Sequence, residues 1–112
     1  MSEITWDDFD QVDIRVGRVV ESEPFPEARK PSIKLVVDFG ESIGTRRTSA
    51  QLTTYYEPKA LLGRQVVAVV NFPPKRIAGF KSEVLVLGVP DDAGEVVLLS
   101  PDRDVPLGGR MF

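Results

Sequence analysis

The chain has 112 residues, a length typical of a single domain, and 42% of them are apolar, which is enough for one hydrophobic core. It contains no cysteine and no histidine, which excludes disulfides, cysteine-based metal sites and histidine-dependent catalytic triads, so a binding protein is expected and not an enzyme. The net charge of −3 argues against a general nucleic-acid binder.

The first residues predict a single helical turn. Residues 5–9 have the Ser/Thr-x-x-acid spacing of a capping box, with Asp8 in the place of the usual Glu or Gln. The start of the chain is acidic and unlike a signal peptide, and no stretch approaches the roughly 20 apolar residues of a membrane span. We therefore expect a cytoplasmic protein, without membrane insertion, that begins with a helical extension over residues 1–12.

Three strands are predicted in the first half of the chain, over residues 13–22, 33–40 and 46–52. Apolar residues alternate with others along the first two, and the third carries small and polar side chains. Gly17 lies inside the first strand and indicates the bulge or sharp bend that a small barrel needs at a corner. A charged, proline-rich loop, residues 24–31, joins the first two strands.

The hydrophobic period then changes. Residues 53–63 predict a short helix, with Pro58 near its first turn and Gly63 as its stop. Strands are predicted again over residues 64–72, 82–89 and 95–100. The apolar run at 66–70 has no polar face, which indicates burial on both faces.

Three strands, a short helix and two strands follow the order of an OB-fold, a five-stranded Greek-key barrel. We therefore predict an all-β single domain over residues 1–112, with a C-terminal dimerisation extension over residues 90–112. In OB-folds the outer face of strands two and three and the loops 1–2 and 4–5 bind oligonucleotides. Residues 24–31 would form the 1–2 loop, and residues 73–81, PPKRIAGFK, the 4–5 loop.

A homodimer is expected from the amount of apolar sequence. The run at 66–70, the extra strand at 95–100 and the terminal Met111 and Phe112 are more than one small barrel would cover. Exposed in a monomer, such patches favour aggregation, whereas a two-fold axis would bury them.

Charge is distributed unevenly along the chain. Residues 14–81 contain twelve Lys and Arg against six acidic residues, whereas residues 1–13 and 82–112 are both net acidic. A cationic middle between acidic ends can hold an anion on one face while suppressing loose binding to DNA. Charge segregation of this size also occurs without any ligand, so both interpretations stay open at this point.

The candidate tRNA- or anion-binding residues lie on strands two and three and at the 4–5 loop. They are Lys34, Arg46, Arg47, Ser49, Gln51, Asn71, Lys75, Arg76, Phe80 and Ser82. Prolines 73 and 74 favour an extended backbone that would hold the loop cations away from the barrel.

Several of these assignments have an alternative. The loop cations Lys75 and Arg76, with Lys81, either bind an anion or only keep the loop soluble. Phe80 either offers a base a stacking surface or anchors the loop in the mouth of the barrel. Asn71 and Ser82 either hydrogen-bond the ligand or cap the backbone of the loop.

Carboxylates are the remaining candidate metal ligands. Asp7, Asp8 and Asp10, and the pair Asp91 and Asp92, fall at a predicted helix start and a predicted turn, where such residues ordinarily cap backbone. We expect no metal and no cofactor, with a Mg²⁺ site at either group as the weaker alternative.

Four stretches together are similar to one known family. They are VDIRVGRVVESEPFPEARKPSIKLVVDFG, TSAQLT, YEPKALLGRQVVAVVNFPP and GFKSEVLVLG. They resemble the CsaA-type protein-export chaperones over nearly the whole chain and, more distantly, stand-alone tRNA-binding domains and the tRNA-binding extension of methionyl-tRNA synthetases. The resemblance implies a homodimeric OB-barrel that binds unfolded preproteins and peptides, the export motor SecA, and tRNA.

The chain departs from the synthetase-type tRNA binders at one point. Ser82 is followed by Glu83 and Val84, where those proteins have a Gly-Met pair. With the net acidic charge, this predicts weak to moderate tRNA binding. The expected function is therefore a non-enzymatic CsaA-like export chaperone that also binds tRNA, and the alternative is a stand-alone, structure-specific tRNA-binding protein.

Overall fold

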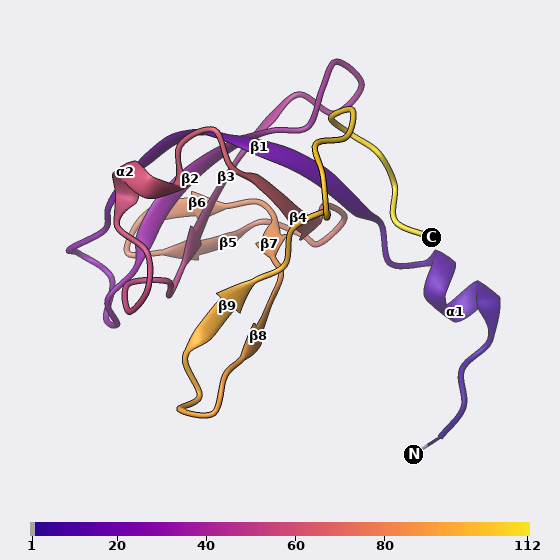
Figure 1. The fold of residues 1–112 in the computed structure, drawn as a ribbon, viewed down its shortest axis with the longest axis horizontal. Helices are drawn as coiled ribbons and strands as arrows, with labels where there is room; N and C mark the ends of the chain where they lie inside the picture. Colours follow the sequence, from indigo (N-terminus) through magenta and orange to yellow (C-terminus); the bar gives the residue numbers. More distant parts are fainter. Residues whose placement is uncertain (1) are drawn as a thin grey trace.

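The computed structural model describes residues 2–112 (Figure 1). Its helices and strands are α1 (Trp6–Asp10), β1 (Ile14–Pro24), β2 (Ile33–Asp38), β3 (Thr45–Ala50), α2 (Pro58–Leu61), β4 (Gln65–Val69), β5 (Lys75–Ile77), β6 (Phe80–Ser82), β7 (Leu85–Val86), β8 (Gly88–Pro90) and β9 (Val96–Leu98).

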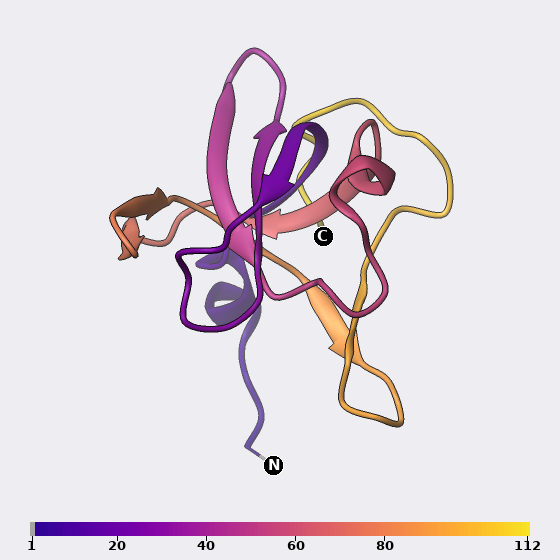
Figure 2. The ribbon, with the colours of Figure 1, turned by 90° about the vertical axis from the view of Figure 1, so that its left-hand side faces the viewer.

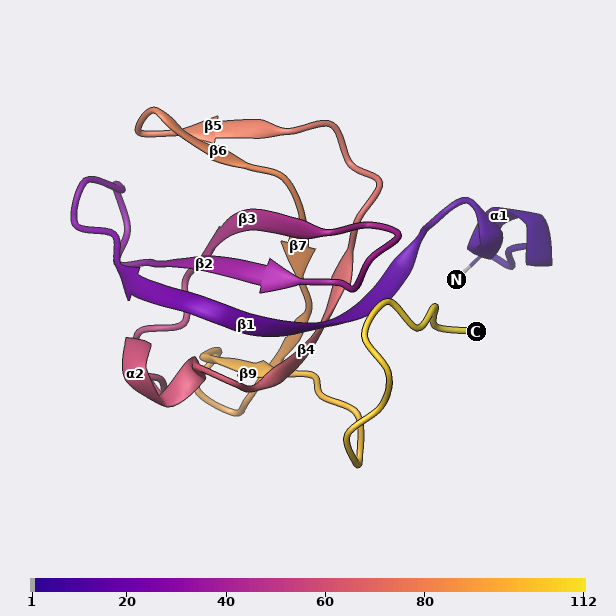
Figure 3. The same cartoon turned by 90° about the horizontal axis from the view of Figure 1, so that it is seen from above.

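Five strands form one antiparallel sheet in the order β3-β2-β1-β4-β7, which curls until its ends approach each other (Figures 2 and 3). The chain just before β7 lies beside β3, where Glu83 N–H donates to Arg47 O and Thr48 Oγ1 donates to Val84 O, both at 2.7 Å. The Arg47 N–H donates in turn to the Glu83 carboxylate at 3.1 Å. The result is an all-β, five-stranded, nearly closed barrel, which is consistent with the predicted OB-fold.

Side chains fill the inside of this barrel. The alternation predicted for residues 33–40 is confirmed by four side chains that are at most 1% exposed, Ile33, Leu35, Val37 and Phe39. The helix α2, which follows β3 and precedes β4, adds Leu61 to the same core. Because the interior is filled, a ligand can meet only the outer surface of the barrel and its loops.

The long strand β1 takes part in both halves of the barrel, since its first part pairs with β4 and its second part with β2. Gly17 lies on the first part, where a Cβ would be 2.5 Å from Val37 Cγ1 and 2.8 Å from the Phe39 ring. The strand can cross the core this closely only because the position has no side chain. The irregularity in the ladder lies slightly further on, between Val19 and Glu21.

The C-terminal tail covers the part of β1 that β2 leaves free. Val16 N–H donates to Gly109 O at 3.0 Å, and Gly108 N–H donates to Val16 O at 2.8 Å. Met111 N–H donates to Ile14 O at 2.8 Å. The end of the segment that was expected to dimerise therefore also completes the barrel of its own chain.

Residues 73–81, expected to form an extended loop, contain a two-stranded hairpin. The strands β5 and β6 pair antiparallel. Their turn is Ala78-Gly79, with φ angles of 48° and 80°, as a two-residue type I′ turn requires. The sequence hides this turn because alanine stands where asparagine or aspartate usually marks it.

The strand expected over residues 82–89 is interrupted, so that prediction was wrong in its extent. Only β7 joins the barrel, and β8 pairs with β9 in a separate hairpin that projects from it (Figure 1). At Gly88 a Cβ would lie 2.7 Å from Val96 Cγ1. The glycine therefore allows β9 to pack closely against the start of β8.

The strand β4, whose apolar run was one reason to expect a homodimer, is already buried within one chain. Its residues 65–69 are all at most 9% exposed in a single copy of the chain. One face meets the barrel core, and on the other Val67 and Val69 pack with Phe9 and Leu87. This apolar run therefore needs no second copy to cover it.

The N-terminal helix begins as predicted. Thr5 and Asp8 form both hydrogen bonds of a capping box. The helix α1 lies beyond the barrel, beside the C-terminus (Figures 1 and 3). Within residues 2–112 no helix has the length and apolar character needed to cross a membrane.

The β8–β9 hairpin is tied to the segment between β3 and α2. Tyr55 O–H donates to Asp91, and Thr54 Oγ1 donates to Glu95 at 2.6 Å. The first bond lowers the pKa of Asp91 from its ordinary 3.8 and raises the pKa of Tyr55 from 10.0. The Tyr55–Asp91 hydrogen bond therefore stabilises the fold fully between pH 3.8 and pH 10.0, the two ordinary pKa values. This stabilisation is lost as pH falls through the lowered pKa of Asp91, or as pH rises through the raised pKa of Tyr55.

We predict that Gly17→Ala lowers the free energy of unfolding by about 1–3 kcal/mol, because the added methyl group overpacks the core at Val37 and Phe39. Urea denaturation followed by circular dichroism measures the effect. Gly109→Ala is the control, since its Cβ would meet its nearest neighbour, Pro106 O, at 3.5 Å. The control should change stability by no more than about 0.5 kcal/mol, and equal stabilities of the two variants would contradict the assigned role of Gly17.

Candidate nucleic-acid interface

The 1–2 and 4–5 loops meet through two phenylalanines. Phe25, at the start of the 1–2 loop, and Phe80, in β6, pack edge to face with ring centroids 5.4 Å apart. Phe25 is buried and Phe80 is half-buried. Aromatic pairs at this separation attract each other beyond the effect of area alone, so the contact holds the β5–β6 hairpin against the barrel.

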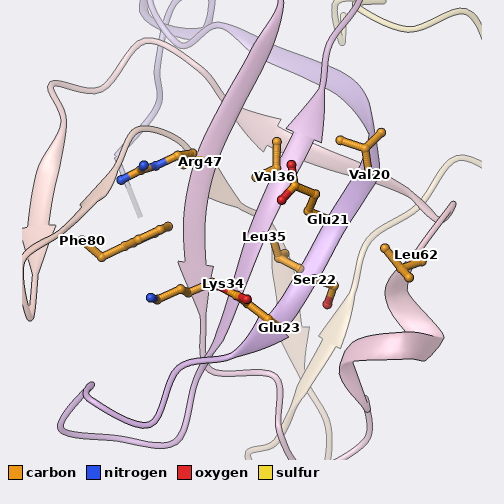
Figure 4. A pocket seen from close by; sticks show the side chains of 10 residues that line it. All are labelled: Val20, Glu21, Ser22, Glu23, Lys34, Leu35, Val36, Arg47, Leu62 and Phe80. Atoms are coloured by element: carbon orange, nitrogen blue, oxygen red, sulfur yellow. The ribbon is translucent and has the colours of Figure 1, made fainter.

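Two cationic side chains lie against these rings. Lys34 Nζ is 4.6 Å from the centroid of Phe25 and 5.2 Å from that of Phe80, and Arg47 Cζ is 4.7 Å from the centroid of Phe80. These distances are within the range of cation–π attraction. The Phe80 side chain lies between those of Arg47 and Lys34 (Figure 4). Of the two roles considered for Phe80, the geometry favours the loop anchor, since its ring already contacts both cations.

Neither cation forms an ion pair with a carboxylate within residues 2–112. Glu23 lies directly opposite Lys34 in the β1–β2 register. The Lys34 ammonium group instead lies over the rings of Phe25 and Phe80. The rings therefore fix two positive charges at the surface without neutralising them.

The strand register decides which candidates share the outer face of β2 and β3. Lys34 pairs with Ser49, and Val36 pairs with Arg47, so these four side chains face outward together. Arg46 is the neighbour of Arg47 in the strand and points to the opposite face, where its Nη1 donates to a backbone carbonyl at 3.0 Å. The structure thus unites Lys34, Arg47 and Ser49 but not Arg46.

An open groove of about 450 Å³ crosses this outer face (Figure 4). Lys34, Arg47 and Phe80 lie on one side of it. Glu21 and Glu23 of β1 lie on the other side. The groove therefore has an acidic wall on β1 and a cationic wall on β3 and the hairpin, and the Lys34 side chain of β2 leans to the cationic side over the Phe25 and Phe80 rings.

The hairpin separates the two cations of the 4–5 loop. Lys75 pairs with Ser82, and Arg76 pairs with Lys81. Alternate residues of a strand point to opposite faces, so Lys75 shares the barrel side with Phe80, whereas Arg76 points away from it. Both are exposed, but they do not form one cluster with Lys34 and Arg47.

Asn71 and Ser82 contact the protein itself. Asn71 accepts a hydrogen bond from Asp13 N–H at 3.0 Å and donates to Gln11 O at 2.8 Å, which ties the end of β4 to the N-terminal extension. Ser82 Oγ lies 3.2 Å from Thr48 Oγ1, where the hairpin joins β3. These hydrogen bonds do not cap the backbone of the loop: Asn71 binds the backbone of the N-terminal extension, and Ser82 contacts a side chain of β3.

Gln51 lies away from the groove that holds Lys34 and Arg47. It is exposed and lines a second hollow with Ser49, between the 1–2 loop and the hairpin. Arg29 and Lys30 of the 1–2 loop line the same hollow. Ser49 stands at the border of the two surfaces.

No group of three or more acidic side chains is placed to hold a metal ion within residues 2–112. Asp8 caps α1. Asp91 accepts hydrogen bonds from Tyr55 and from the Ala93 and Glu95 N–H groups. These are the capping and turn roles that such residues ordinarily have.

Phe25 and the two acidic side chains of the groove were not predicted from the sequence. Phe25 stands between two prolines in a charged loop, and only its isolation as a lone aromatic residue could have indicated an anchor. In the sequence, Glu21 and Glu23 are simply two acidic residues of a predicted strand. Their position opposite Lys34 and Arg47 follows from how β1, β2 and β3 pair, which the sequence does not reveal.

Two solved structures resemble the chain over nearly its whole length. The chaperone CsaA from Bacillus anthracis is 51% identical, with a TM-score of 0.92, and the match covers 99% of this chain and 100% of that one. The CsaA chaperone protein from Picrophilus torridus is 48% identical, with a TM-score of 0.90, over 98% of this chain and 100% of that one.

Curated relatives include longer proteins. The methionine–tRNA ligase of Chloroherpeton thalassium is 42% identical over 105 residues, and that of Methanocaldococcus jannaschii is 35% identical over 111. The matches cover 94% and 99% of this chain but only 15% and 17% of the ligases, so the chain spans less than a fifth of these relatives.

The model of one family, "Putative tRNA binding domain", matches residues 14–110. This range runs from the start of β1 to the tail that pairs with it, and so includes the whole barrel. The family is defined by a binding domain and not by a catalytic centre. The chain therefore belongs to the tRNA binding domain family, and CsaA chaperones resemble it over nearly its whole length.

Proposed function

We propose that the protein is a non-enzymatic binding protein that holds tRNA on the outer face of β2 and β3. One observation supports this most directly: Lys34 and Arg47 are fixed by Phe25 and Phe80 and carry no ion pair within residues 2–112. Cations that are already positioned lose little side-chain entropy when a phosphate binds. Membership of the tRNA binding domain family supports the same ligand.

Three further candidate residues have supporting roles in the proposed site. Ser49 is placed beside Lys34 to hydrogen-bond a phosphate or sugar. Lys75 and Arg76 extend the cationic surface along the hairpin and would position backbone without reading sequence. Two cations fixed in the groove, on a net acidic chain, predict weak to moderate affinity.

A second function is favoured by a hollow between the hairpin and β7. Phe72 and Leu85, which are 53% and 50% exposed, line it with Pro73 and Ile77. Exposed apolar side chains around a hollow suit the apolar side chains of an unfolded polypeptide. We propose that the protein binds unfolded preproteins there as an export chaperone, and association with the motor SecA remains a prediction from the resemblance.

We also propose a homodimer, now on different residues from the buried β4. Ile4 is 71% exposed and Trp6 is 83% exposed, and both line a hollow at the N-terminal extension with Phe9 and Phe112. Phe112 lies beside the N-terminal helix at the end of the chain. A second copy would bury this surface across a two-fold axis.

We predict that Lys34→Gln and Arg47→Gln each weaken tRNA binding, because each removes the cation that neutralises one phosphate. The plot of log K against log salt should flatten by about 0.7–0.9 for each phosphate that is no longer neutralised. Fluorescence anisotropy with labelled tRNA at several salt concentrations measures both effects. Arg103→Gln, which removes one charge from an exposed pair with Asp102, is the control; if it matches the other variants, the groove is not the site.

We predict that Leu85→Ser weakens binding of a permanently unfolded protein, such as reduced and carboxymethylated α-lactalbumin, because it removes apolar contact area. Leu62→Ser is the matched control, since Leu62 is also 50% exposed but lines the charged groove. Isothermal titration calorimetry should show weaker binding for Leu85→Ser alone and little change with salt. Equal affinities of the two variants would exclude the hollow beside Leu85.

We predict a particle of twice the 12.4 kDa chain mass in sedimentation equilibrium, and a monomer for Trp6→Ser. Trp6 is the single tryptophan, so its emission should shift to the red when dilution dissociates the wild-type dimer. A clean 12.4 kDa wild-type species at micromolar concentration would refute the dimer.

A further inference from the structure

The charged groove has two sides of opposite sign: β2 separates Arg47 from the carboxylates of β1, and Lys34 projects from β2 itself towards the Phe80 ring. In the β1–β2 and β2–β3 registers, Glu23 lies opposite Lys34, and Glu21 and Arg47 both lie opposite Val36, one on each side of it. The carboxylates of β1 and the cation of β3 are thus two strand spacings apart, about 10 Å. This separation is close to the Debye length of about 8–10 Å at 0.1–0.15 M salt, so both walls act on a ligand in the groove.

The acidic wall is free to act on a ligand. Glu21 and Glu23 are exposed and form no ion pair within the described residues. Ser22, between them, lies opposite the buried Leu35, so its side chain points towards the barrel interior and not into the groove. The groove therefore holds two exposed carboxylates that form no ion pair in the part of the chain that the structure describes.

A groove with one cationic side and one acidic side distinguishes between helical and unpaired RNA. An RNA helix carries phosphates on both flanks of each groove, so one phosphate row would face the carboxylates and be repelled. An unpaired strand has its phosphates along one edge and its bases along the other. With the phosphates at Lys34 and Arg47, the base edges cross Val36 and reach Glu21 and Glu23. Carboxylates accept hydrogen bonds from exocyclic amino groups, such as N4 of cytosine.

We propose that the groove binds an unpaired stretch of RNA, with phosphates on the Lys34–Arg47 wall and amino-bearing bases directed at Glu21 and Glu23. This inference rests on the RNA-binding function proposed above and specifies which part of a folded RNA the site takes, namely a loop or a free end and not a helical stem. Glu21 and Glu23 are thereby specificity-determining residues, since they penalise helices and uracil, which has no exocyclic amino group.

The test compares three labelled probes of equal length by fluorescence anisotropy at low salt: oligocytidine, oligouridine and an RNA duplex. The wild-type protein should bind oligocytidine at least about threefold more tightly than oligouridine, and more tightly than the duplex. Glu21→Gln/Glu23→Gln should bind the duplex and oligouridine more tightly than the wild type does, and its preference for oligocytidine should shrink towards one.

Glu3→Gln/Asp92→Asn is the matched control, since it makes the same change of net charge at exposed positions outside the groove. It should alter the affinities for all three probes by a common factor and leave their ratios unchanged. Equal wild-type affinity for the three probes, or ratios that do not change in the groove variant, would overturn the inference. If the wild type binds neither these probes nor tRNA, the proposed function itself fails, whereas tRNA binding without probe preference refutes only the orientation proposed here.

Discussion

The whole barrel depends on how closely β1 crosses its own core. The strand belongs to two sheet halves, and Gly17 lies where Val37 Cγ1 and the Phe39 ring leave no room for a Cβ. Because β1 can approach this closely, β2 and β4 lie on its two sides and the sheet curls far enough to bring β3 near β7. The 1–2 and 4–5 loops are then brought to one end of the barrel, where Phe25 and Phe80 touch.

The contact between Phe25 and Phe80, which the closed barrel brings about, positions two cationic side chains. A salt bridge would also fix Lys34 or Arg47, but it would cancel the charge, and exposed ion pairs contribute only about 0–1 kcal/mol. A ring attracts an exposed cation by a similar amount, about 0.5–1 kcal/mol, and leaves its full charge available to a ligand. The arrangement thus positions two cations on a chain that is acidic overall.

The sequence predicted correctly those features of the fold that depend on residues close together in the chain. The capping box at Thr5 and Asp8, the alternation of β2 and the order of the barrel strands all depend on spacing along the chain. The β5–β6 hairpin was missed because its turn uses Ala78 in a left-handed conformation, which is uncommon for alanine.

The candidate site was only partly predictable for a different reason. Lys34, Arg47 and Phe80 were selected as residues of a face and a loop, and the structure brings these three together. Arg46 was included because it is adjacent in sequence, yet adjacency in a strand places it on the other face. Phe25, Glu21 and Glu23 depend on contacts between segments far apart in sequence, which no local pattern contains.

The seam of the barrel differs from the rest of the sheet. Between β3 and the chain before β7, the Thr48 hydroxyl and the Glu83 carboxylate supply hydrogen bonds that a continuous ladder would take from backbone. These two side chains lie at the base of the β5–β6 hairpin, whereas nothing lies within 4 Å of a Cβ built at Gly79, at its tip. Closure of the barrel is therefore independent of how far the hairpin extends. A segment of another length could be grafted at Ala78-Gly79, which makes this hairpin the natural place to add new recognition elements to the scaffold.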